Sequence, residues 1–320
     1  MALGTREEFV YGICPDCGVS WLMNPPSDIG KYYQNYYSLE ERSPQLVKRA
    51  LRMLRNGFYR QFIGGSMRIL CGQFYNYGFH AICKNDLSAY ECSYDMGFPL
   101  NVCSMFGSGL KADSKILDYG CGKGEFVFEM SRLGFHEIIG MDPFLKDEIV
   151  FPTGARVIPG SRFRLSDSPN SYDVITMHHV LEHIENPFEV VRTIAGSLNK
   201  GGTLLVRIPN IGSPHFHRYR GNWWGFHAPR HFFLYSRKSL EIVLGTVGLE
   251  IVFTKCDSEY DHYLYSQEYE LDIADNSPFS FRNGADGIFT RSEMRYWKEK
   301  SKRLNHALVG DSIAYYIKHK

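Results

Sequence analysis

The chain has 320 residues, of which 44% are hydrophobic and 22% are charged, and its net charge at pH 7 is +1. These values are ordinary for a globular domain and exclude a disordered, collagen-like or coiled-coil chain. The balance of 36 basic and 35 acidic side chains gives no global sign of nucleic-acid binding. The eight cysteines form no disulfide pattern, and no apolar stretch reaches the roughly 18 residues of a membrane span. We therefore expect a cytoplasmic protein.

Two stretches precede the regular part of the chain. Residues 1–41 contain the sequence Cys-Pro-Asp-Cys at Cys14–Cys17 and a cluster of tyrosines. Residues 42–110 open with a basic segment, Arg42–Arg68, which holds seven Arg and Lys side chains, no acidic one, and apolar residues at helical spacing. Two readings stay open: a solvated helix face packed on the core, or peripheral contact with an anionic membrane surface or a phosphate-bearing substrate.

From residue 111 onward, short β-rich runs alternate with helical runs. The predicted strands are 115–119, 137–141, 155–158, 172–177, 203–208 and 250–254, and the predicted helices are 125–133, 187–198 and 236–245. This alternation predicts an α/β fold with a doubly wound, mostly parallel sheet covered on both faces. Ligands of such sheets bind at the edge formed by the carboxyl ends of the strands.

A glycine-rich turn follows the first of these strands. Asp118 lies next to the end of the strand, and Gly120, Gly122 and Gly124 follow at alternate positions before a helix begins. The dinucleotide-binding motif is excluded because Glu125 occupies the position of its third glycine. The carboxylate of Asp118 would repel a pyrophosphate and suits a ligand with an ammonium group. An ordinary tight turn is the alternative.

A second carboxylate, Asp142, ends the next strand, 24 residues after Asp118. A carboxylate at this place accepts hydrogen bonds from the hydroxyls of a ribose, and Pro143 and Phe144 would form a wall for an adenine. A turn cap is the alternative for Asp142. Together the two carboxylates predict a site for a nucleoside with a short zwitterionic tail.

Several motifs in order carry a family resemblance. The sequences ILDYGCGKGEF at 116–126, VLEHI at 180–184, LNKGGTLLVRIPN at 198–210 and HAPRHFFLYS at 227–236 resemble the class I S-adenosylmethionine-dependent methyltransferases. The resemblance implies a Rossmann-like seven-stranded sheet, closed by an antiparallel strand near the C-terminus. It also implies three regions. These are a degenerate zinc-ribbon-like segment at 1–41, a basic helical cap at 42–110, and a cofactor-binding core at 111–320 with an insertion at about 255–310.

The resemblance also implies a set of residues for the cofactor, S-adenosylmethionine. They are Asp118, Tyr119, Gly120, Cys121, Gly122, Gly124, Phe126, Asp142, Pro143, Phe144, Ser161, Arg162, Phe163, His178 and His179. The family usually has an aspartate where this chain has Ser161, so the backbone of Arg162 or Phe163 is expected to contact the adenine instead. Glu182 and His183 belong to the Val-Leu-Glu-His motif and either contact the site or cap a helix.

For the proton that an acceptor loses, His231 is the expected base and His227 the reserve. His231 resembles in position a histidine of sugar C-methyltransferases, whose neighbouring Tyr and Glu are absent here, and this favours O- or N-methylation. A structural role is the alternative for His231. Trp223 and Trp224 are expected to form a wall for the acceptor or to pack in the core.

The resemblance favours a small-molecule acceptor that contains a sugar, linked to a nucleotide or a lipid, in polysaccharide assembly. The alternatives are a quinone-like or lipid acceptor, and a scaffold that binds the cofactor without turnover. We expect no nucleic-acid partner. We also expect no metal, because a zinc ribbon needs a second cysteine pair and the chain has only Cys14 and Cys17 in such spacing.

Overall fold

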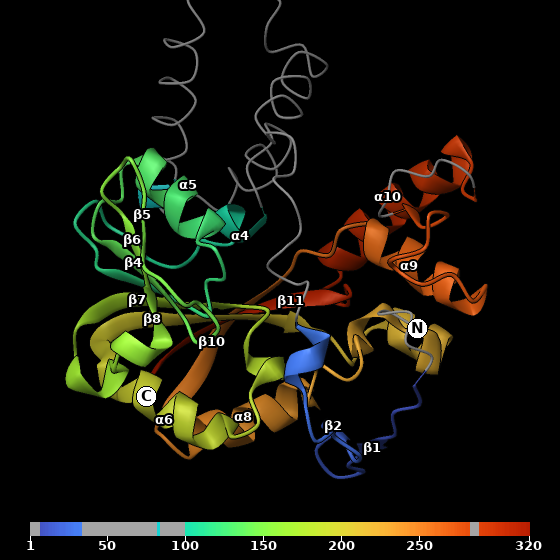
Figure 1. The fold of residues 1–320 in the computed structure, drawn as a ribbon, viewed down its shortest axis with the longest axis horizontal. Helices are drawn as coiled ribbons and strands as arrows, with labels where there is room; N and C mark the ends of the chain where they lie inside the picture. Colours follow the sequence, from blue (N-terminus) through green and yellow to red (C-terminus); the bar gives the residue numbers. More distant parts are fainter. Residues whose placement is uncertain (1–6, 34–81, 84–99, 282–287) are drawn as a thin grey trace, which may run out of the picture.

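A computed structural model describes residues 7–33, 82–83, 100–281 and 288–320 (Figure 1). The predicted basic segment, Arg42–Arg68, lies outside these residues. Within the described residues, no helix is both long and apolar enough to cross a membrane.

The main body is one sheet with helices on both of its faces (Figure 1). Its elements, with the helix that precedes them, are α4 (Leu100–Cys103), β3 (Ile116–Tyr119), α5 (Glu125–Leu133), β4 (Ile138–Asp142), β5 (Ile149–Val150), β6 (Arg156–Pro159), β7 (Tyr172–His178), α6 (Pro187–Ser197), β8 (Leu198–Pro209), α7 (Pro214–Tyr219), α8 (Arg237–Gly245), β10 (Leu249–Cys256), α9 (Asp261–Glu270), α10 (Arg291–His306) and β11 (Ser312–His319). The strand order is β10-β11-β8-β7-β3-β4-β6-β5. Strands β8, β7, β3, β4 and β6 run parallel, whereas β11 is antiparallel to both of its neighbours. The carboxyl ends of the parallel strands therefore meet at one edge.

The sheet confirms the predicted fold class and differs from it in one respect. An eighth strand, β5, has only two residues and pairs antiparallel with β6. So short a run carries no period-two pattern, which is why the sequence did not reveal it.

The helix ends follow from local side-chain chemistry. Asn186 caps α6 by accepting a hydrogen bond from the backbone N–H of Glu189, and Pro187 occupies the first helical position. Ser236 caps α8 in the same way. Gly134 ends α5 in the left-handed conformation that glycine adopts readily.

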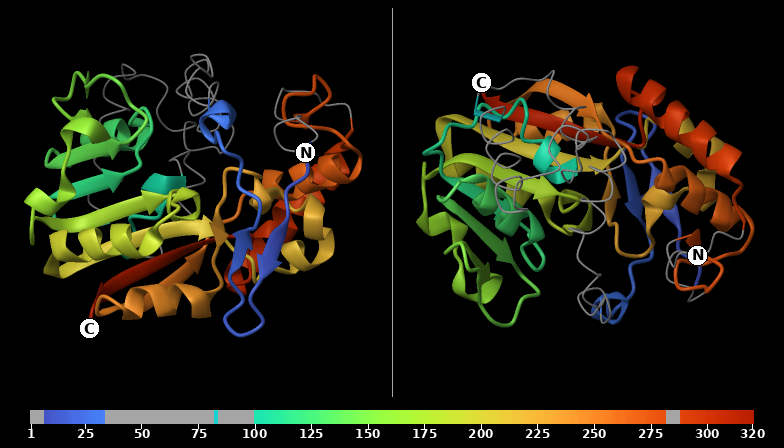
Figure 2. Two further views of the ribbon diagram at one scale, coloured as in Figure 1. Left: turned by 60° about the horizontal axis from the view of Figure 1, so that its bottom comes forward. Right: turned by 90° about the horizontal axis from the view of Figure 1, so that it is seen from above.

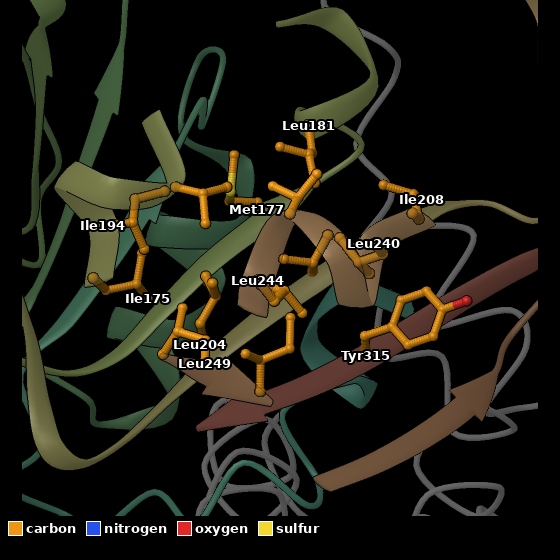
Figure 3. Packing of buried hydrophobic residues seen from close by; sticks show 14 of the residues in the cluster. Ile175, Met177, Leu181, Ile194, Leu204, Ile208, Leu240, Leu244, Leu249 and Tyr315 are labelled. Atoms are coloured by element: carbon orange, nitrogen blue, oxygen red, sulfur yellow. The ribbon is translucent and has the colours of Figure 1, made fainter. Parts of the chain in front are cut away.

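Two hydrophobic clusters cover the two faces of the sheet. One lies under α4 and α5 and includes Met105, Phe106 and Phe135. The other lies under α6 and α8 and includes Ile175, Leu204 and Leu240 (Figure 3). Residues 100–110, which were expected in the cap, contribute Val102, Cys103, Met105, Phe106 and Leu110 to the first cluster. The hydroxyl of Tyr316 in β11 also donates to the carbonyls of Ser104 and Phe106, so this segment packs as part of the core.

A second, small sheet joins the N-terminal segment to the core. Strands β1 (Tyr11–Ile13) and β2 (Ser20–Leu22) form a hairpin, and β2 pairs with β9 (Phe233–Leu234). Cys14 and Cys17 lie in the turn of this hairpin. Both views of Figure 2 show the hairpin, in blue, away from the green half of the main sheet. The Tyr11 hydroxyl donates to the carbonyl of His231, so the hairpin touches the segment that carries the predicted base.

The connection from β10 to β11 contains α9 and α10, a region predicted only as an insertion. Helix α10 begins with a capping box between Thr290 and Glu293. Helix α9 is largely buried and packs against the segment that contains Trp224.

Candidate functional site

The glycine-rich turn after β3 adopts a conformation that requires glycine. Gly120, Gly122 and Gly124 have φ angles of 77°, 57° and 80°, which side chains other than glycine rarely adopt. A Cβ on Gly120 would lie 2.6 Å from Val180, so the turn is in close contact with the loop after β7. Glycine therefore lets the turn pack closely against this loop at the carboxyl edge of the sheet.

Asp118 lies under this turn and is 3% exposed. Thr176, on the neighbouring strand β7, donates a hydrogen bond of 2.7 Å to its carboxylate. Burial, aided by the charge of Asp142, raises the pKa of Asp118 to about 7, although the bond from Thr176 opposes the shift. A buried carboxylate of this kind is stabilised in its charged form by a cation. Asp118 therefore fits the ammonium group of the expected cofactor.

Asp142, the last residue of β4, is also 3% exposed. One of its carboxylate oxygens accepts from the backbone N–H of Gly122 and the other from that of Phe144, both at 2.9 Å. A carboxylate at the carboxyl end of this strand is the usual acceptor for the hydroxyls of a ribose. Asp142 thus fixes the glycine turn and fits the ribose of the expected cofactor.

The predicted adenine side lies at the ends of β4 and β6. The ring of Phe144 is 52% exposed and stacks on Tyr33 at a centroid distance of 5.1 Å. A Cβ on Gly160 would lie 2.8 Å from Cα of Pro143, so the backbone after β6 lies against Pro143. The following 3-10 helix, Gly160–Arg162, exposes Ser161 and Arg162, and Phe163 is half-buried beside them. The residues predicted for the adenine are therefore brought to one place.

The two histidines after β7 differ in their surroundings. His178 packs edge-on against Phe126 at 4.8 Å, and neither of its buried ring nitrogens has a hydrogen-bond partner in the described part of the chain. Burial holds the pKa of His178 well below its usual value, so the ring is neutral. His179 has a φ of 55° and lies 3.1 Å, through Nδ1, from the carboxylate of Glu182.

His231, the predicted base, is 4% exposed, and its Nδ1 lies 2.7 Å from the carbonyl oxygen of Gly225. Because a carbonyl only accepts, Nδ1 carries the proton and Nε2 carries the lone pair. Burial, followed by the charge of His183, holds the pKa of His231 well below its usual value. The reserve base, His227, instead accepts a hydrogen bond from the guanidinium of Arg230, which makes its lone pair less available.

The 3-10 helix Leu181–His183 brings two residues to this place that the sequence left undecided. Glu182 is fully buried, and its carbonyl accepts from the N–H of Phe232, next to His231. The rings of His183 and His231 lie 4.5 Å apart. Tyr33, which the sequence marked only as part of a tyrosine cluster, bonds through its hydroxyl to Nδ1 of His183 at 3.1 Å. Tyr33 therefore links the adenine side of the site to the histidines.

The two predicted tryptophans have different roles. Trp223 is 1% exposed and donates to Asp311 at 2.6 Å, so it belongs to the core. Trp224 is partly exposed, stacks on His262 at 4.0 Å and lies near His227. Of the pair, Trp224 fits a wall for an acceptor.

Part of the chain is similar to known methyltransferases. Residues 101–253 match a family model described as a methyltransferase domain. The chain is 31% identical over 104 residues to the ubiquinone biosynthesis O-methyltransferase of Aliivibrio fischeri, a match that covers 30% of this chain and 44% of the relative. It is 29% identical over 106 residues to the tRNA U34 carboxymethyltransferase of Campylobacter hominis, covering 29% of this chain and 35% of the relative. The matched segments thus span less than half the length of these relatives.

Among solved structures, an S-adenosylmethionine-dependent methyltransferase from Archaeoglobus fulgidus is similar at a TM-score of 0.37 and 19% identity, covering 65% of this chain and 86% of that chain.

Proposed function

Residues 101–253 belong to the methyltransferase-domain family, and from this premise we propose that the protein transfers the methyl group of S-adenosylmethionine to an oxygen or nitrogen of a small-molecule acceptor. The family match confirms the class I domain and the cofactor that the sequence predicts. The observation that carries the proposal is the pair of buried carboxylates, Asp118 and Asp142, on either side of the glycine turn. S-adenosylmethionine supplies an activated methyl group on a sulfonium, and the protein's task is to position the acceptor and remove its proton.

For the acceptor we propose a sugar-containing molecule, linked to a nucleotide or a lipid, as the sequence resemblance implies. A quinone-like acceptor is the second candidate, and the similarity to an O-methyltransferase of ubiquinone biosynthesis favours it. The partly exposed ring of Trp224 suits either class, because a sugar face and a flat aromatic ring both stack on indole. Transfer of labelled methyl groups to nucleotide sugars, glycolipids and dihydroxyphenols would separate the two.

Replacement of His231 tests the chemistry. We expect His231→Ala to lower turnover at least about 100-fold, the usual contribution of a group that assists proton removal. Affinity for S-adenosylmethionine is expected to stay unchanged, because the expected cofactor residues lie at the ends of β3, β4, β6 and β7 and not in the loop that carries His231. His217→Ala, which removes an exposed histidine from α7, is the matched control. Unchanged turnover in His231→Ala would refute this role, and cofactor binding without transfer to any acceptor would favour the scaffold.

Cofactor binding is also expected to release a proton below pH 7. The pKa of Asp118 is raised to about 7, chiefly by burial, so the carboxyl is partly protonated at pH 6 to 7. An ammonium group beside it favours the charged form. Binding therefore releases a proton, and the affinity increases as the pH rises toward 7. Calorimetric titrations in two buffers of different ionisation enthalpy measure the release, which Asp118→Asn should abolish. Equal proton release by Asp118→Asn would contradict this assignment.

A further inference from the structure

Three side chains with metal-binding atoms converge beside the proposed acceptor site. One carboxylate oxygen of Glu182 and one ring nitrogen each of His183 and His231 all lie within 4.8 Å of one another. Glu182 and His231 are buried and His183 is partly exposed. In the part of the chain that the structure describes, this is the one group of His, Cys, Asp and Glu residues close enough to share an ion.

Both imidazoles are held in a tautomer that leaves the Nε2 lone pair to bind a metal ion. Nδ1 of His183 lies 2.9 Å from the carbonyl oxygen of Arg230, and Nδ1 of His231 lies 2.7 Å from that of Gly225. Each carbonyl can only accept, so each Nδ1 carries the proton and each Nε2 carries the lone pair. Histidines that bind metals are usually oriented in this way, through a bond from the other ring nitrogen to a backbone carbonyl or a carboxylate.

The carboxylate of Glu182 supplies an independent observation. Glu182 is fully buried, and one of its carboxylate oxygens lies 3.1 Å from Nδ1 of His179. The other oxygen, Oε2, is buried without a hydrogen-bond partner among the described residues. A buried carboxylate oxygen without a partner is costly. A cation between Glu182 and the two histidines removes this cost.

We propose that Glu182, His183 and His231 bind one divalent transition-metal ion, and that zinc fits best. Magnesium and calcium prefer sets of oxygen ligands, which two imidazoles do not provide. Two histidines and one glutamate form a known set for zinc sites that keep a position open for a further ligand. Ligand atoms of one tetrahedral zinc ion lie about 3.4 Å apart, so the three side chains move closer together when they bind the ion.

The ion's place in the reaction rests on the proposed function. Val180 touches the glycine turn, and Glu182 follows it by two residues, so the cluster borders the methionine end of the cofactor site. An acceptor hydroxyl in the open position loses its proton to water, because the cation stabilises the resulting alkoxide. The alkoxide oxygen then forms a bond to the methyl carbon, the carbon–sulfur bond breaks, and its electron pair returns to sulfur as a neutral thioether. In this scheme His231 is a metal ligand. His231→Ala is therefore still expected to lower turnover, because it weakens binding of the ion.

Metal binding by the full chain tests the site without a need for activity. The protein is stripped with a chelator and titrated with Zn²⁺ by calorimetry, and with Co²⁺ by visible absorption. We expect one ion per chain. Loss of a residue that hydrogen-bonds to a metal ligand weakens metal binding by about 10–100-fold. Loss of a ligand itself, in Glu182→Gln or His231→Ala, should therefore weaken binding by more than about 100-fold, with S-adenosylmethionine binding retained as evidence of folding. His217→Ala is the control for a histidine outside the cluster.

Two outcomes overturn the proposal. In the first, the wild type binds one ion per chain, and Glu182→Gln and His231→Ala still bind it. If a double variant, Cys14→Ser with Cys17→Ser, then loses the ion, the site lies in the hairpin. The other is no Zn²⁺ or Co²⁺ binding by the folded wild type. Metal binding at the cluster by a protein that methylates no acceptor would keep this site and refute only the proposed function.

Discussion

The largest effect on cofactor binding is expected from Asp142→Ala, which should lower the affinity for S-adenosylmethionine at least about 100-fold. Hydrogen bonds to a charged group contribute about 1.5–3 kcal/mol each, so two ribose hydroxyls account for at least about 3 kcal/mol. The substitution also removes the acceptor for the N–H groups of Gly122 and Phe144. The glycine turn therefore loses its anchor at the same time. Calorimetric titration with S-adenosylmethionine and S-adenosylhomocysteine measures the loss.

Two further variants separate the contributions of Asp142. Asp142→Asn keeps one acceptor oxygen and should fall between the wild type and Asp142→Ala. Asp147→Ala removes an exposed carboxylate five residues later and should bind normally. Thermal unfolding without ligand checks that each variant is folded. Near-normal binding by folded Asp142→Ala would show that the ribose lies elsewhere.

The sequence predicted those parts of the site that lie at strand ends. Asp118 and Asp142 were found because each ends an apolar strand, and parallel strands bring such ends to one edge. The helix predicted at 125–133 has the observed bounds, since the glycine before it and the glycine after it mark its ends. Strong local periodicity and turn residues are sufficient for these features.

The contacts that depend on distant segments were not predictable. Tyr33 approaches His183 from 150 residues away in the chain, and no local pattern distinguishes it from the other tyrosines. The expectation that no metal binds was based on cysteine pairs alone and did not take Glu182, His183 and His231 into account. His231 joins Glu182 and His183 only because the loop before β9 folds back onto the helix after β7, and sequence spacing does not encode that approach.

The largest effect on stability is expected from Asp311→Ala, because this fully buried carboxylate holds three segments together. It accepts hydrogen bonds from the hydroxyl of Ser213 at 2.8 Å and the indole N–H of Trp223 at 2.6 Å, and Nδ1 of His215 lies 2.9 Å from its other oxygen. Breaking a buried ion pair by removing one partner typically costs about 3–5 kcal/mol. We expect a loss of that size in urea unfolding. Glu250→Ala, an exposed carboxylate on β10, should change stability by no more than about 0.5 kcal/mol.

The pH dependence of this contribution has a definite sign. Burial alone would raise the pKa of Asp311, but the neighbouring His215 holds it below the ordinary value. A lowered pKa in the folded state stabilises the fold above the ordinary pKa of the carboxyl, and the contribution is lost as the pH falls through the folded value. Since Asn cannot titrate, the difference in unfolding free energy between wild type and Asp311→Asn should shrink below about pH 4. A difference that grows on acidification would show that Asp311 is protonated in the fold.

The segment held by Asp311 through Trp223 continues to Gly225 and His231, so Asp311→Asn should also lower turnover while cofactor affinity is retained.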